Sequence, residues 1–150
     1  MKFVTSNQID QQKLSLQTSE PTHYIYALDD SGSMSGQKWN ELMIAFRTSI
    51  TKLRGLPEAE KNIKVSILIE GSTCLQHQEN ATPNSVNLNI NPRYGGNNFA
   101  DTFGKAHALI AKYVSSSKIK YVFMTDGGCG YPTTQVNQIK TLKNSYPNKI

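Results

Sequence analysis

Apolar residues along the chain fall into two kinds of pattern, and the first predicts strands. Short, largely apolar runs cover residues 24–28, 63–69 and 119–125, and the first and last of these have the composition of strands buried on both faces of a sheet. Residues 73–77 follow the second run after only three residues, so we expect a hairpin whose second strand lies antiparallel.

The second pattern, apolar residues at steps of three and four, predicts amphipathic helices. These steps occur over residues 37–54, 99–113 and 136–146, and Pro147 stops the last helix. Strands that alternate with helices predict an α/β, Rossmann-like, doubly wound fold. We expect a mostly parallel sheet with one antiparallel edge strand and helices on both faces, linked by right-handed crossovers.

The first predicted strand runs into a cluster of oxygen-bearing side chains. Residues 29–36 read Asp-Asp-Ser-Gly-Ser-Met-Ser-Gly, and if the chain stays extended there, Asp29, Ser31 and Ser33 point to the same side. A carboxylate and two hydroxyls suit a hard cation such as Mg²⁺, which takes about six oxygen ligands and keeps several waters. We therefore predict a metal site, with Asp30 on the opposite side, behind the ligands or facing solvent.

Two later segments extend this pattern. Residues 95–101 read Gly-Gly-Asn-Asn-Phe-Ala-Asp, and residues 122–128 read Val-Phe-Met-Thr-Asp-Gly-Gly. Taken in order, the three segments resemble the metal-ion-dependent adhesion site (MIDAS) of von Willebrand factor type A (vWA) domains. The resemblance implies a bound Mg²⁺, or Mn²⁺ or Ca²⁺ in its place, and five metal-site residues: Asp29, Ser31, Ser33, Asn97 and Asp126.

One of these positions departs from the family pattern. Asn97 stands where the family has a ligating threonine, and its amide oxygen can coordinate Mg²⁺ or Ca²⁺ but lies further from the backbone. Because oxygen donors remain at every position, we expect the site to bind a divalent ion. The alternative is a degenerate site that is kept only as a loop structure.

The site residues also fit a rule for open α/β sheets, in which ligands bind beyond the carboxyl ends of strands where the strand order reverses. Asp29 and Asp126 both stand at such strand ends. If the strands at 24–28 and 119–125 are neighbours across this point, the loop that carries Asn97 falls between them.

Composition is that of an ordinary soluble globular domain: 150 residues, 37% hydrophobic and 18% charged. No segment approaches a membrane span, and the two cysteines, Cys74 and Cys129, form no disulfide framework, so we expect a cytoplasmic protein. The net charge of +5 is scattered without a Lys/Arg block, so we expect no nucleic-acid binding. We assign residues 1–21 to a polar leader and residues 22–150 to one vWA-like domain.

The family's fold usually continues for about two more strands and two more helices. We therefore expect the domain to be short at its C-terminus and the strand at 119–125 to form an apolar edge, open to pairing with another chain. Residues 1–5 can cover that edge only with a strand order unlike the family's.

Three classes of function are considered. The leading one is a metal-dependent, adhesion-type protein-interaction module whose cation binds an acidic side chain of a partner. The second is a metal-free structural scaffold in a larger assembly. The third is a Mg²⁺-dependent phosphoryl-transfer enzyme with Asp29 as nucleophile, but Ser31 stands where such enzymes place a second carboxylate, and the three histidines are isolated. We therefore expect no enzymatic activity.

Overall fold

The computed structural model describes residues 20–57 and 62–150. Most of the predicted leader, with the proposed edge cover at residues 1–5, lies outside this part of the chain. The elements follow in this order: β1 (Thr22–Asp29), the 3-10 helix η1 (Gly32–Met34), α2 (Gln37–Arg54), β2 (Ile63–Glu70), β3 (Leu75–Ala81), the 3-10 helix η2 (Pro83–Ser85), α3 (Phe99–Tyr113), β4 (Lys118–Met124) and α4 (Thr133–Ser145).

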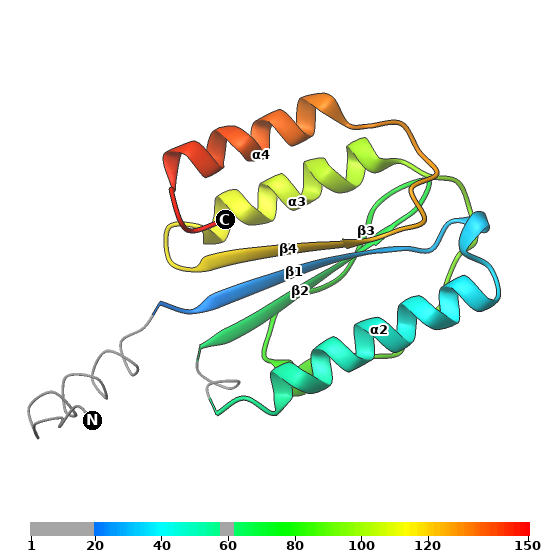
Figure 1. The fold of residues 1–150 in the computed structure, drawn as a ribbon, viewed down its shortest axis with the longest axis horizontal. Helices are drawn as coiled ribbons and strands as arrows, with labels where there is room; N and C mark the ends of the chain where they lie inside the picture. The colour runs from blue at the N-terminus through cyan, green and yellow to red at the C-terminus, as the bar shows by residue number, and fades with distance from the viewer. Residues whose placement is uncertain (1–19, 58–61) are drawn as a thin grey trace, which may run out of the picture.

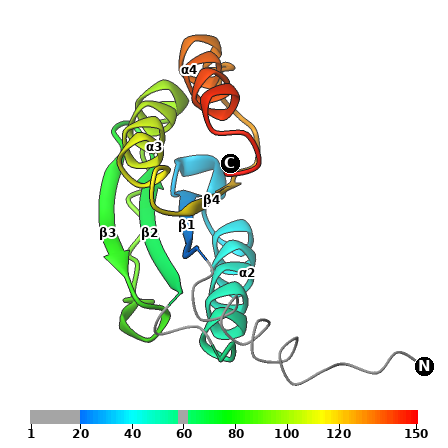
Figure 2. The ribbon, with the colours of Figure 1, turned by 90° about the vertical axis from the view of Figure 1, so that its left-hand side faces the viewer.

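The sheet has the strand order β3-β2-β1-β4. β1 pairs in parallel with both β2 and β4, and β3 runs antiparallel to β2. α2 covers one face, whereas α3 and α4 lie on the other (Figures 1 and 2). The predicted doubly wound α/β fold is confirmed, and the strand order reverses between β1 and β4, where a ligand site is expected.

The central strand β1 is buried on both faces, as its unbroken apolar run predicts. Tyr26 and Leu28 pack into the cluster under α2, whose own stripe includes Phe46 and Ile50. The alternate residues of β1, starting at Ile25, pack against α3 on the opposite face. β1 is therefore a rigid platform from which the loop after Asp29 departs.

The antiparallel strand differs from its prediction of residues 73–77. β3 begins at Leu75 and continues to Ala81, and its pairing with β2 shifts register twice. The five residues between Leu75 and Ala81 are polar and no residue of β3 is fully buried, so backbone pairing extends into a segment that carries no apolar signal. Residues 86–90 form no strand, although Val86 and Ile90 are buried.

β4 also differs, because it was predicted to be buried on both faces. Only Ile119 in this strand is buried, and within the described residues β4 pairs with β1 alone. α4 has no fully buried residue and begins at Thr133 rather than at residue 136. The outer side of β4 is therefore half-exposed, as expected for an edge strand.

No helix in the described ranges combines the length and the apolar character that crossing a bilayer requires.

His23 is a buried polar residue of β1, on the face that α3 covers. Its Nε2 lies 2.7 Å from Ser66 Oγ on β2, and its ring packs on Tyr113, with 4.2 Å between ring centroids. Burial lowers the pKa of His23 to about 4, with Glu79 acting in the opposite direction. The imidazole is therefore neutral in the folded protein at pH 7.

We expect His23 to make the protein sensitive to acid. An unfolded histidine titrates near 6.5 and folded His23 near 4, so the unfolded state binds the proton first as the pH falls. The contribution of His23 to the free energy of unfolding is fully present above pH 6.5, and about 3 kcal/mol of it is lost by pH 4. Urea unfolding at pH 4 to 7 of the wild type and His23→Gln measures the difference, and equal pH dependence in the two proteins would contradict the assignment.

Candidate metal centre

Asp29 ends β1 and is fully buried. Its Oδ1 accepts a hydrogen bond from the Ser31 N–H at 2.9 Å, and its Oδ2 accepts one from the Thr125 hydroxyl at 2.6 Å. Thr125 directly follows β4, so this bond joins the ends of the two strands across which the order reverses. Both oxygens of Asp29 thus have protein donors.

Ser31 and Ser33 bring their hydroxyl oxygens to 3.1 Å from each other. The sequence predicted this proximity from extended backbone, but the chain makes a 3-10 turn at Gly32–Met34 instead. Ser31 is buried, whereas Ser33 is exposed. The pair therefore brings a buried and an exposed hydroxyl together just after Asp29.

Asp126 lies on the loop after β4 and faces the same turn. Its pKa is lowered, chiefly by a hydrogen bond from the Ser33 hydroxyl and further by Lys38 and the Gly128 N–H. Lys38 Nζ lies 3.3 Å from Asp126 Oδ2. The structure thus brings Asp29, Ser31, Ser33 and Asp126 together through a chain of contacts.

Asn97 lies on the loop before α3, and its Oδ1 is buried without a hydrogen-bond partner among the described residues. A buried amide oxygen without a donor is unfavourable. A cation is one group that would satisfy it, as would a water molecule.

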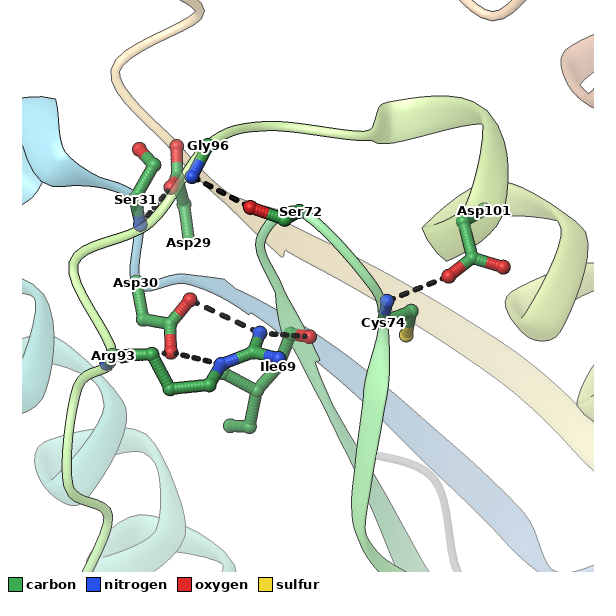
Figure 3. Close-up of polar contacts among 9 residues, drawn as sticks. All are labelled: Asp29, Asp30, Ser31, Ile69, Ser72, Cys74, Arg93, Gly96 and Asp101. Carbon is green, nitrogen blue, oxygen red and sulfur yellow. Dashed lines mark hydrogen bonds and ion pairs between the residues drawn. The ribbon is translucent and has the colours of Figure 1, made fainter.

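Asp30 was predicted to lie behind the ligands or to face solvent, and the structure excludes the solvent-facing alternative. Its carboxylate is fully buried and forms a two-pronged ion pair with Arg93: Nε to Oδ2 at 2.8 Å and Nη2 to Oδ1 at 3.1 Å (Figure 3). A Cβ added at Gly71 would lie 2.5 Å from Arg93 Nη2. The turn after Asp29 directs Asp30 beneath the loop that carries Arg93. Because Gly71 has no side chain, there is room for the Arg93 guanidinium beside it.

Four further hydrogen bonds attach the same loop, residues 93–98, to the ends of β1 and β2. They run from Tyr94 N to Asp30 O at 2.9 Å, from Gly32 N to Gly95 O at 2.8 Å, from Gly96 N to Ser72 Oγ at 2.7 Å and from Asn98 N to Glu70 Oε1 at 2.7 Å. Asn98 also caps α3 by accepting from Asp101 N. The loop that carries Asn97 is therefore fixed at both ends.

Glu70 is a site residue that the sequence prediction missed. It ends β2, is fully buried, and is the register partner of Asp29. Burial raises its pKa to about 8; the bond from Asn98 N opposes this rise, and Asp29 and Asp30 add to it. The available signal was a carboxylate that closes a buried apolar strand at the same sheet edge as Asp29.

These donors fit a hard divalent cation. No group of three or more His, Cys, Asp or Glu side chains is placed to hold a metal within residues 20–57 and 62–150, so a site rich in thiolate, imidazole or carboxylate ligands is not what this region offers. It offers two hydroxyls, an amide oxygen and two carboxylates, the oxygen donors that Mg²⁺, Mn²⁺ and Ca²⁺ accept. Cys129, near Asp126, is a free thiol.

Comparison with solved structures assigns the fold. Mussel byssus proximal thread matrix protein 1, with a zinc-occupied MIDAS motif, superposes with a TM-score of 0.64 at 13% identity, over 82% of this chain and 36% of that one. The pilus adhesin SpaC of Lactobacillus rhamnosus GG gives 0.64 at 16% identity, over 74% and 15%. The ArnB paralog VWA2 of Sulfolobus acidocaldarius gives 0.52 at 19%, over 72% and 28%. The chain has the fold of a vWA-type domain.

This chain spans only a minor part of each of these three proteins. The largest share is 36%, for the mussel protein. No protein-family model and no curated protein sequence matches the chain.

Removal of Arg93 is expected to destabilise the protein strongly. Arg93→Met leaves the Asp30 carboxylate buried without its cation, which lowers the free energy of unfolding by about 3 kcal/mol. The double variant Arg93→Met/Asp30→Asn should recover part of this loss, because the charge is then gone too. Urea unfolding of the wild type, the single variant and the double variant measures these differences in the free energy of unfolding.

Arg47→Met is the matched control for Arg93→Met. Arg47 is exposed, and among residues 20–57 and 62–150 its side chain donates one hydrogen bond, of 3.4 Å, to the Leu88 carbonyl, so its replacement should change stability by less than about 0.5 kcal/mol. Equal losses from Arg93→Met and Arg47→Met would contradict the role given to the ion pair.

Proposed function

We propose that this chain is a metal-dependent protein-interaction module in which a divalent cation at the vWA site binds an acidic side chain of a partner. The observation that carries the proposal is the convergence of Ser31, Ser33 and Asp126 beside Asp29, with the unpartnered Asn97 oxygen on the adjoining loop. Mg²⁺ is the first candidate, with Mn²⁺ or Ca²⁺ in its place.

The hydrogen bonds that Asp29 and Asp126 already accept explain how such a site would attract an anion. Both oxygens of Asp29 accept bonds from protein donors, and Asp126 is engaged by Ser33, Lys38 and Gly128. The hydroxyls of Ser31 and Ser33 are thus the readiest direct donors, and both are neutral. A cation held mainly by neutral donors keeps most of its charge for a carboxylate ligand.

The surroundings add positive electrostatic potential at the edge of the sheet where the site lies. α2 is 18 residues long and begins at Gln37, immediately after the turn that carries both serines, and helix N-termini favour anions. Lys38, in the first turn of α2, is more than half exposed. A partner carboxylate that approaches the serines therefore meets a favourable field.

The names of two matched proteins support this proposal: SpaC is a pilus adhesin, and the mussel protein carries zinc in a MIDAS motif. The metal-free scaffold stays the second candidate, because Asn97 replaces the family's threonine. The phosphoryl-transfer alternative is less favoured, since both oxygens of Asp29 accept hydrogen bonds, which reduces their availability as a nucleophile. Cytoplasmic location and pairing along the edge of β4 stay predictions.

We expect the folded chain to bind Mg²⁺ or Mn²⁺ at one saturable site in a calorimetric titration. The double variant Ser31→Ala/Ser33→Ala should abolish binding, because it removes the two neutral donors. Ser35→Ala is the matched control, since Ser35 is an exposed serine of the same turn, and its affinity should equal that of the wild type. A folded wild type that binds neither ion would favour the metal-free scaffold.

A short peptide tests the acidic partner directly. With Mg²⁺ present, the peptide Gly-Gly-Asp-Gly-Gly with an acetylated N-terminus and an amidated C-terminus should shift the backbone amide NMR signals of Ser33 and Gly127, because its one carboxylate completes the site. The peptide with Asn in place of Asp should leave them unchanged, as should the Asp peptide in EDTA. Equal shifts under all three conditions would contradict recognition of a carboxylate through the cation.

A further inference from the structure

Glu70 joins two segments of the candidate site that are far apart in sequence. Its Oε1 accepts the Asn98 N–H at 2.7 Å, and the residue stands opposite Asp29, its register partner on β1. Asn98 directly follows Asn97, so Glu70 connects the residue that ends β1 to the loop that presents the amide oxygen.

The position of Glu70 is unfavourable unless these contacts compensate for it. The side chain is fully buried at the end of a strand whose preceding residues are largely buried and apolar, and a buried carboxyl group without partners is costly. Arg93, which approaches the same strand ends, is engaged by Asp30. Among the described residues the compensation comes from the Asn98 N–H at Oε1, whereas Oε2 is buried without a hydrogen-bond partner.

We propose that Glu70 is a positioning residue of the cation site, which holds the loop at Asn97 beside the end of β1 through its hydrogen bond with the Asn98 N–H. This inference rests on the proposed function. Asn97 supplies an amide oxygen further from the backbone than a threonine hydroxyl, so its reach depends on where the backbone at residues 97 and 98 is held. The bond from Asn98 N to Glu70 holds it directly.

Two near-isosteric variants separate hydrogen bonding from charge. Glu70→Gln keeps an oxygen acceptor for Asn98 N, so its affinity for Mn²⁺ in calorimetry should stay within about threefold of the wild type. Glu70→Met fills the same space without that bond and should bind Mn²⁺ about 10- to 100-fold more weakly, as when a residue that orients metal ligands is lost.

Glu79→Met is the matched control for Glu70→Met. Glu79 lies on β3, where it bonds Lys112 and Tyr113, and its replacement should leave the Mn²⁺ affinity unchanged. Circular dichroism and urea unfolding in EDTA establish that each variant folds. If Glu70→Met does not fold, Glu70→Gln decides alone: retained affinity supports the positioning role, and lost affinity overturns it.

Three outcomes contradict the inference, and they are distinguishable. Equal weakening in Glu70→Gln and Glu70→Met would show that the charge is required. Wild-type affinity in a folded Glu70→Met would show that Glu70 does not position the site, while metal binding itself would stand. A wild type that binds no Mn²⁺ would overturn the proposed function, and this inference with it.

Discussion

The burial of three carboxyl groups at the ends of two adjacent strands organises this end of the molecule. Asp29, Asp30 and Glu70 are all fully buried, and carboxyl groups are rarely found there unless they are paired or hydrogen-bonded. Arg93 compensates Asp30, whereas backbone N–H groups and the Thr125 hydroxyl compensate the other two. Each compensating group belongs to a loop, so the bonds that make burial tolerable also hold the loops in place.

The sheet determines which loops meet. β1 pairs in parallel with β4, and Leu28 stands opposite Met124, so the next residues, Asp29 and Thr125, emerge side by side. β2 on the other side of β1 places Glu70 beside Asp29. The loop from Arg93 to Asn98 then lies across both strand ends. Packing on both faces of β1 holds the strands in place, and the positions of the strand ends determine where the site residues lie.

The sequence predicts the parts of the structure whose signal is local. The bounds of α2 match its apolar stripe, and β1 is an apolar run buried on both faces. The half-burial of β4 contradicts the burial on both faces that its apolar run indicates, but it agrees with the edge position expected for the strand at 119–125. Arg93 and Glu70 were missed because their partners lie on other elements: Asp30 precedes Arg93 by 63 residues and Asn98 follows Glu70 by 28.

Anomalous diffraction from crystals grown with Mn²⁺ tests whether the three segments form a cation site. We predict one strong anomalous peak within coordination distance of the Ser31 and Ser33 hydroxyls and the Asn97 amide oxygen. A peak at other residues, or none at saturating Mn²⁺ with these three side chains ordered, would contradict it.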